Sequence, residues 1–479
     1  MMRFPACLIV LFAAGSAFGQ TPARVTVGAD ARSAVNVTIY NSGLALVRET
    51  RDVELPRGTV ALRYADVASQ IRPETVHVSD ASGQGSFSVL EQNYKYDVLT
   101  PTRLMELYLA RELTLVAVNP ATGEERRRQA TLLSTQDGQY VYRTSEGITF
   151  GLPDRVVLPE VPSNFVERPT LEWLLDAREA GRRTIESAYL TYGMGWSADY
   201  VLVLSDDDRT ADVTGWVTLR NDSGIGFDDV GLQLVAGQVN VVPPPAPPMG
   251  QAVYAYAAMP AATPAPEEPQ FVEEGMFEYH LYTLQRATDL ADREQKQIEL
   301  LGADGVPIEK KYKLEGDSYY YVSQYSGIME NLDVGVWIEF VNSDENHLGM
   351  PLPAGTVRVY KADADGGQQF LGEDAIEHTP REERVKLRVG SAFDIVADRR
   401  QTDYEILSDV LYETEWEVKI RNRKAERVIV EVREPMAGDW EILSSSFEYA
   451  EESARLVVFE VPVDPDEEAV LTYRVRTRY

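Results

Sequence analysis

Hydrophobic and polar residues alternate one for one along most of this chain. Val35, Val37 and Ile39 are each followed by a polar residue, and residues 416–421 repeat the pattern near the other end. A period of two residues predicts half-buried β-strands, because successive side chains of a strand point to opposite faces of its sheet. Turn residues recur between these stretches at the short spacing that is typical of sandwiches and small barrels.

The sequence therefore predicts an all-β fold of several domains. We expect antiparallel, immunoglobulin-like β-sandwiches, a small barrel-like insert and few short helices. Helix is expected at Thr102–Glu112 and at Thr170–Ala180, each of which follows a proline. In the second segment Leu171, Leu174 and Leu175 share a helical face, but the same residues fit a strand equally well.

One strand ending recurs four times. Two apolar residues, spaced by one position, are followed two positions later by asparagine, at Asn41, Asn221, Asn342 and Asn422. Asparagine at the end of a strand can bond nearby backbone and tolerates a left-handed turn, so the pattern indicates strands entering tight loops. The irregular spacing between the four copies argues against a solenoid.

Composition shifts suggest where the domains begin and end. The clearest shift is the proline-rich segment 242–269, which cannot pair into a sheet and is expected to be an exposed loop insertion. The predicted division lists a signal peptide at 1–19, an N-terminal sandwich at 20–91, a small barrel-like domain at 92–162, a central β-rich domain at 163–401 interrupted by 242–269, and a C-terminal immunoglobulin-like sandwich at 402–479.

The first residues indicate export. Arg3 precedes the apolar run Ala6–Ala14, and small residues then end at Gly19, which is the pattern of a removable signal. The run is too short to span a bilayer, and no later segment reaches the ~20 apolar residues of a transmembrane helix. The only cysteine, Cys7, lies inside the signal. The processed chain is therefore expected to use neither disulfides nor cysteine chemistry.

The chain is strongly acidic. It has 46 Lys and Arg against 76 Asp and Glu, for a formal net charge of −30. Such a field repels nucleic acid, so no nucleic-acid partner is expected. Acidity by itself otherwise indicates solubility.

Three segments resemble a known family. They are YLTYGMGWSADY at 189–200, FEYHLY at 277–282 and PLPAGTVRVY at 351–360. These are similar to segments of an exported bacterial family that is known only as the domain of unknown function numbered 4139, which has mucoidy-inhibitor-like relatives. The resemblance implies a β-rich protein of the bacterial cell envelope and assigns no catalytic residues.

Candidate binding residues lie in the first two of these segments. Trp196 and Tyr200, together with Tyr279, His280 and Tyr282, are candidates for a binding face, and the alternative is that the aromatics are core residues. The spacing from Gly193 to Ala198 matches a dinucleotide-binding loop, but a strand rather than a helix follows it, so we reject that function.

Acidic loops provide the one candidate metal site. Asp222, Asp228 and Asp229 follow strands, where sandwich domains can bind calcium through several carboxylates. A solvated turn is the simpler interpretation of the same residues. Calcium is thus a possible ligand, and no other cofactor is indicated.

Taken together, these features predict an exported protein of the bacterial periplasm or envelope that binds or scaffolds without catalysis. Its partner would be an envelope protein or a glycan, and its oligomeric state is not predicted. One alternative is a hydrolase whose paired carboxylates are gathered by the fold. The other is an outer-membrane β-barrel, because the last strand, Leu471–Tyr479, ends in an aromatic residue. Charged residues along single strand faces, such as Glu417, Lys419 and Arg421, weigh against the barrel.

Overall fold

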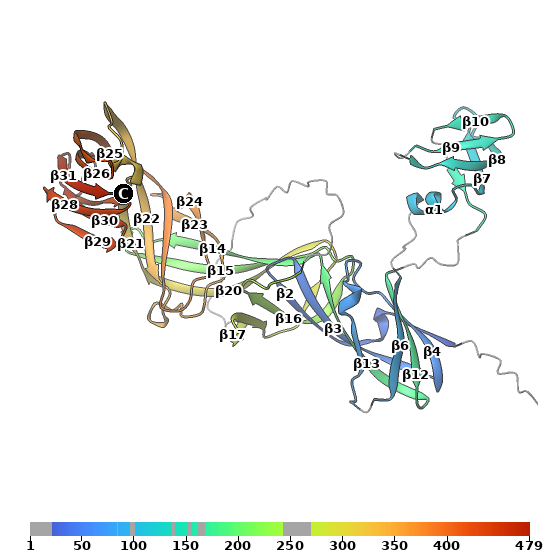
Figure 1. Ribbon diagram of the computed structural model, residues 1–479. Helices are drawn as coiled ribbons and strands as arrows, with labels where there is room; N and C mark the ends of the chain where they lie inside the picture. The colour runs from blue at the N-terminus through green and yellow to red at the C-terminus, as the bar shows by residue number, and fades with distance from the viewer. Residues whose placement is uncertain are drawn as a thin grey trace, which may run out of the picture. The chain divides into compact units, whose positions relative to one another are not determined.

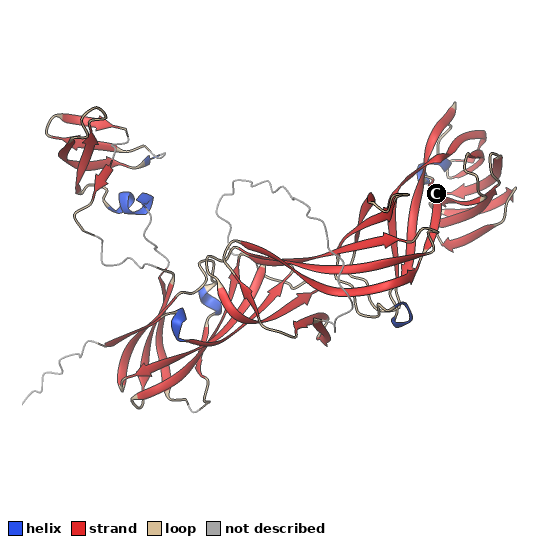
Figure 2. Cartoon of the chain, turned by 180° about the vertical axis from the view of Figure 1, so that it is seen from behind, coloured by secondary structure: helices blue, strands red, loops and turns tan. Residues whose placement is uncertain are grey.

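The computed structural model describes residues 22–83, 85–95, 101–136, 139–151, 155–160, 168–242 and 270–479. The predicted signal at 1–19 and nearly all of the proline-rich segment 242–269 lie outside the described residues. Strands make up most of the described chain (Figure 2). The predicted all-β, multidomain fold with few short helices is confirmed. No helix within the described ranges is long and apolar enough to cross a membrane.

The chain divides into two compact units. The first comprises Met1–Asn36, Leu46–Tyr192 and Ser223–Phe227, and the second comprises Val37–Ala45, Gly193–Asp222 and Asp228–Tyr479. This division is coarser than the one predicted from composition. It also interleaves sequence segments, because strands β2 (Arg32–Tyr40), β3 (Leu44–Leu55) and β16 (Phe227–Ala236) each contribute residues to both units.

The first unit contains two groups of paired strands. One is a four-stranded sheet in the order β1-β4-β12-β6, and the other runs β2-β3-β13-β5. Their bounds are β1 Ala23–Val27, β4 Gly58–Ala65, β12 Thr170–Ala177, β6 Phe87–Lys95, β2 Arg32–Tyr40, β3 Leu44–Leu55, β13 Gly181–Tyr192 and β5 His77–Asp80. Short 3-10 turns occupy Ala29–Ala31 and Pro73–Thr75.

The segment with two open interpretations is strand β12. Leu171, Trp173 and Leu175 are buried, so the apolar face repeats every second residue rather than every third or fourth. Helix at Thr170–Ala180 is therefore wrong, and the strand alternative is correct. The packing of Trp173 against Tyr64 of β4, with ring centroids 5.1 Å apart, fixes this face toward the core.

A small domain within the first unit has its own core. Helix α1 spans Pro101–Leu107, and the sheet has the order β10-β9-β8-β7-β11 (Figure 1). The strands are β7 Glu112–Val118, β8 Glu125–Ser134, β9 Val141–Thr144, β10 Gly147–Phe150 and β11 Arg155–Val157. Met105 and Tyr108 pack against Leu113, Leu132 and Tyr142. The helix ends before the predicted Glu112 because Ala110 takes a left-handed backbone, with φ of 62°.

The second unit begins with a mixed sheet in the order β20-β15-β14-β23-β24. Its strands are β14 Met194–Leu204, β15 Thr210–Asn221, β20 Glu294–Pro307, β23 Gly355–Ala362 and β24 Gln368–Ile376. Four more strands do not belong to this sheet: β16 Phe227–Ala236, β17 Phe271–Met276, β18 Tyr279–Leu284 and β19 Thr288–Leu290. β14 pairs antiparallel with β15 and parallel with β23. This parallel pair joins two of the three family-like segments, 189–200 and 351–360.

The rest of the second unit is a nine-stranded sheet in the order β28-β31-β26-β25-β22-β21-β27-β30-β29. Its strands are β21 Glu309–Glu315, β22 Ile328–Val341, β25 Arg384–Ser408, β26 Leu411–Asn422, β27 Val428–Pro435, β28 Asp439–Ser445, β29 Tyr449–Ser453, β30 Leu456–Val463 and β31 Glu468–Arg478, with 3-10 turns at Ser318–Tyr321 and Asp344–Asn346.

This sheet folds over so that its two halves pack face to face as a sandwich. Strands from its two ends share one core, and Phe459 of β30 stacks on Tyr473 of β31 with ring centroids 4.9 Å apart. Trp416 of β26 is completely buried in the same core. The predicted start of the C-terminal domain at residue 402 lies inside β25, because β21, β22 and β25 also belong to this sandwich.

Three of the four strand-ending asparagines fasten loops. The side-chain amide of Asn422 donates to the carbonyls of Glu426, Val463 and Asp464 at 2.8, 3.2 and 3.2 Å. Asn342 donates to Met350, Thr379 and Pro380, and Asn221 to Leu290 and Ala291. Asn41, by contrast, is exposed in its turn. The pattern therefore marks a buried side-chain clamp at three sites and a simple turn at one.

Candidate functional site

The structure brings three of the predicted binding residues together, but in the interior of the second unit. Trp196 is only 6% exposed and contacts Tyr282 edge to face, with ring centroids 6.3 Å apart. Tyr200 and Tyr282 are buried, and each hydroxyl donates at 2.8 Å to a carbonyl, of Pro353 and Pro351 respectively. These aromatics hold the 351–354 segment in place. They are core residues, and a partner cannot reach them.

The other two predicted binding residues lie at the surface. Nδ1 of His280 is 2.7 Å from a carboxylate oxygen of Glu273 across the β17–β18 hairpin, and the His280 side chain is 44% exposed. Tyr279 lies beside Gly237 and contacts Phe277, which is 91% exposed. The hairpin thus carries an accessible contact between an imidazole and a carboxylate, together with one highly exposed aromatic ring.

A second histidine, His378, lies close enough to His280 for an electrostatic interaction, although the two residues are far apart in the sequence. Nδ1 of His378 accepts a hydrogen bond from the backbone N–H of Ala354 at 3.1 Å. Burial is the main cause that lowers the pKa of His378. Glu377 opposes this shift, and His280 lowers the pKa by a smaller amount than Glu377 raises it. Among the described residues, however, no group of three or more His, Cys, Asp and Glu side chains could hold a metal ion.

The predicted calcium residues do not form such a group either. The Asp222 carboxylate pairs with Arg220. Asp228 and Asp229 are exposed, and Asp229 takes a left-handed backbone while its N–H donates to the Asp289 carboxylate at 2.9 Å. Asp222 follows strand β15, but Asp228 and Asp229 lie inside strand β16 rather than in a loop, so the three carboxylates do not share one loop. The structure therefore gives no reason to place calcium at these three residues.

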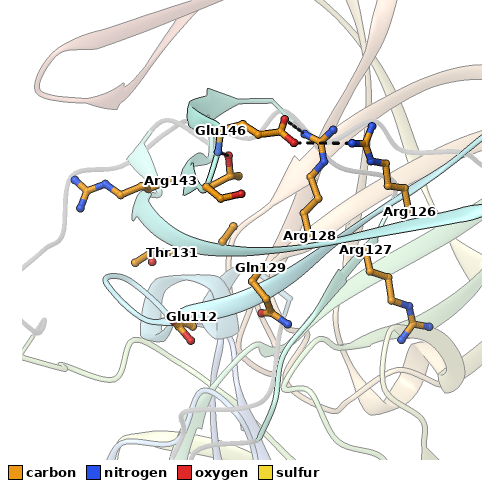
Figure 3. A pocket seen from close by; sticks show the side chains of 11 residues that line it. Glu112, Arg126, Arg127, Arg128, Gln129, Thr131, Arg143 and Glu146 are labelled. Carbon is orange, nitrogen blue, oxygen red and sulfur yellow. Dashed lines mark hydrogen bonds and ion pairs between the residues drawn. The ribbon is translucent and has the colours of Figure 1, made fainter.

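The most distinctive surface lies on the small domain. A pocket of about 560 Å³, open to solvent, is lined by Arg126, Arg127, Arg128 and Arg143 and by two carboxylates, Glu112 and Glu146 (Figure 3). We call it the arginine pocket. Three of its arginines are consecutive on β8, Arg143 is on β9, and Glu146 lies in the tight turn between β9 and β10.

Charge in the arginine pocket is unbalanced. Arg128 lies 3.1 Å and Arg126 3.9 Å from the Glu146 carboxylate, so two positive charges share a single negative charge. Their side chains are 40% and 69% exposed. Arg127 points to the opposite side of β8, as Figure 3 shows, and pairs with Glu125 at 3.0 Å. Arg143 is in register with Thr131 and therefore lies on the Arg127 side of the sheet, where it forms no ion pair within the described part of the chain. The excess positive charge is therefore accessible.

This arrangement suits an anionic ligand. A guanidinium group presents several N–H donors in a plane and binds carboxylate, phosphate or sulfate oxygens in pairs. The contrast with the surroundings strengthens the point. Residues 101–160 contain seven arginines against eight acidic residues, so this domain is almost neutral in a chain with a net charge of −30.

Sequence reasoning missed this site. The run Arg126–Arg128 is a visible signal, because three consecutive cations stand out in so acidic a chain. The contributions of Arg143 and Glu146 depend on the β8–β9–β10 pairing and carry no local signal.

Comparison with known proteins adds no assignment to this geometry. No protein-family model matches the chain, and no curated protein sequence matches it at a significant level.

Proposed function

We propose that this chain is an exported, non-catalytic binding or scaffolding protein of the bacterial cell envelope, and that its small domain binds an anionic envelope protein or glycan. The arginine pocket is the observation that carries the proposal. Arg126 and Arg128 share one carboxylate, and Arg143 has no ion-pair partner among the described residues, which favours recognition of anions over chemistry on them.

Other features support the same proposal. The signal-like residues 1–19 favour export to the periplasm or envelope. The three family-like segments contact one another through Tyr200, Tyr282 and the β14–β23 pair, which supports the proposed relation to the uncharacterised envelope family.

The hydrolase alternative has less support. Glu315 is the one carboxyl among the described residues whose pKa is raised, and burial is the cause. The nearby Glu434 is completely buried and is held by Arg399. Glu315 is half exposed and lies 3.5 Å from Arg433, but a substrate cannot reach Glu434, so the two groups cannot act together as an acid and base on a bound substrate.

The test uses the tagged full-length protein in its native host. Envelope fractionation locates the protein, and affinity capture with quantitative mass spectrometry identifies what binds it. A variant with Arg126→Ser, Arg128→Ser and Arg143→Ser removes three charges from the arginine pocket. We expect it to lose the captured partner while keeping the wild-type circular dichroism spectrum.

The matched control removes three charges elsewhere. Arg182, Arg209 and Arg293 have side chains that are 74%, 84% and 87% exposed, and all three become serine in the control variant. The control should retain the partner, because it changes net charge equally without touching the arginine pocket. Equal capture by the two variants would refute a role for the pocket.

A further inference from the structure

Strand β10 lies at one edge of the small-domain sheet, as far as the structure describes the chain. Within the described residues β10 pairs only with β9. Bonded and non-bonded residue pairs alternate along an antiparallel ladder. Gly151 donates to the Tyr140 carbonyl at 3.3 Å, which makes that pair a bonded one. The peptide N–H and C=O groups of Ile148 and Phe150 therefore point away from β9, toward the open side.

The side chains of this edge are bare and apolar. Ile148 is 66% and Phe150 is 79% exposed, and every residue of β10 is exposed. Isolated proteins usually protect a sheet edge with charges, proline or a covering segment, because free peptide groups beside apolar side chains invite another strand. The sequence of β10, Gly-Ile-Thr-Phe, contains no charged residue and no proline.

Positive charge flanks the edge on two sides. Arg143 lies directly opposite Ile148 in the β9–β10 register, so the two side chains share a face of the sheet. At the turn end of β10, Arg126 and Arg128 share the single carboxylate of Glu146. A strand added beside β10 would thus run past apolar side chains and end near unbalanced arginines.

We infer that the anionic partner is a protein segment that pairs with β10 as an added, extended strand bearing acidic side chains. Backbone hydrogen bonds to Ile148 and Phe150 would supply affinity, apolar side chains would cover the two exposed residues, and carboxylates would meet Arg143 and the arginine pocket. The inference rests on the proposed function, because it names the partner class for the same surface. An acidic glycan also offers carboxylates but has no peptide groups for the edge.

The experiment uses the full-length protein and a defined probe, a fluorescein-labelled peptide of alternating valine and glutamate. Ile148→Pro removes the outward N–H at a position where an edge strand tolerates proline, and Ile148→Thr shortens the side chain but keeps the N–H. We expect the proline variant to bind the probe about tenfold more weakly than the threonine variant, a difference of ~1.4 kcal/mol. Hydrogen exchange at residues 147–151 should slow when the probe binds.

Three results would overturn the inference. They are failure of the wild-type protein to bind the probe at millimolar concentration, equal binding by the two Ile148 variants, and unchanged hydrogen exchange at β10. Displacement of the probe by oligogalacturonate, an acidic glycan, with no effect of Ile148→Pro would assign the arginines to a glycan instead.

Failure here and failure of the proposed function are distinguishable. If the Arg126, Arg128 and Arg143 variant loses its captured partner while the β10 tests fail, the anion-binding function stands without the added strand. If that variant keeps its partner, the proposed function itself fails, whatever the probe does.

Discussion

Removing Arg399 should destabilise the C-terminal sandwich far more than its surface counterpart. Arg399 and Glu434 are both completely buried. Nη1 of Arg399 donates to Glu434 at 2.9 Å, and Nη2 lies 2.7 Å from the other carboxylate oxygen, close enough for an ion pair but not aligned for a hydrogen bond. Tyr321 also donates to this carboxylate, at 2.7 Å. Burial is the largest single effect and lowers the pKa of Arg399, but Glu434, Tyr473 and Tyr321 together raise it overall.

The magnitude follows from what Arg399→Met leaves behind. Glu434 would keep the hydrogen bond from Tyr321 but lose its cation while remaining buried, and breaking a buried pair by removing one partner costs about 3–5 kcal/mol. The double variant Arg399→Met/Glu434→Leu removes both charges. It loses the hydrogen bond from Tyr321 to a charged acceptor, worth about 1.5–3 kcal/mol, but it leaves no unpaired charge in the core. The double variant should therefore be more stable than the single one.

Arg400→Met is the matched control, one residue away in the same strand. Arg400 pairs with Glu417 at 2.9 Å, and its side chain is 46% exposed, so its loss should cost less than about 1 kcal/mol. Because a chain of two units need not unfold in one step, the assay should be local. Urea titrations with hydrogen exchange read at Val428–Pro435, the strand that carries Glu434, report the unfolding midpoint of this sandwich.

Two results would refute the reasoning. If Arg399→Met shifts the midpoint no more than Arg400→Met, the buried pair does not hold the sandwich together. If the double variant is as unstable as the single variant, the cost comes from lost packing of the arginine side chain rather than from a stranded carboxylate.

Two further predictions concern buried polar groups. Asn422→Ala should destabilise the same sandwich by about 1–3 kcal/mol, because three loop carbonyls lose their donor, whereas Asn41→Ala should have little effect; equal urea midpoints would contradict this. Burial also raises the pKa of Tyr200, Tyr321 and Tyr473 well above 10.0. A raised pKa contributes stability that is complete below the unfolded value near 10 and is lost as pH rises toward the folded value. Tyrosinate absorbance in an alkaline titration should therefore show these residues ionising together with unfolding, and gradual ionisation of a protein that keeps its circular dichroism spectrum would argue against it.

Strand content was readable from the sequence because alternation is a local property. The residues around Trp416 alternate in the sequence, and the same residues alternate between core and surface in β26. Segment 170–177 was ambiguous for a local reason too, since its leucines fit both periods. Only the pairing of β12 with β4 and β6 decides which face is buried.

The candidate site was less predictable because accessibility depends on distant pairing. Trp196 and Tyr200 stood out by residue type, yet contacts with residues far along the chain bury both. The arginine pocket showed the opposite behaviour. Its run of cations was visible, but its accessibility and the open edge of β10 follow from the order of five strands.

The parallel pairing of β21 with β27 has a consequence for how the chain folds. Leu314 lies beside Val432, so the C-terminal sandwich cannot close until more than a hundred further residues have been synthesised. Contacts so distant in sequence slow folding, because the intervening loop must be ordered before any contact is gained. Meanwhile the apolar faces of β21, β22 and β25 lack their covering layer. A nascent chain of this protein should therefore depend on a holdase for longer than a sandwich built from sequence-adjacent hairpins would.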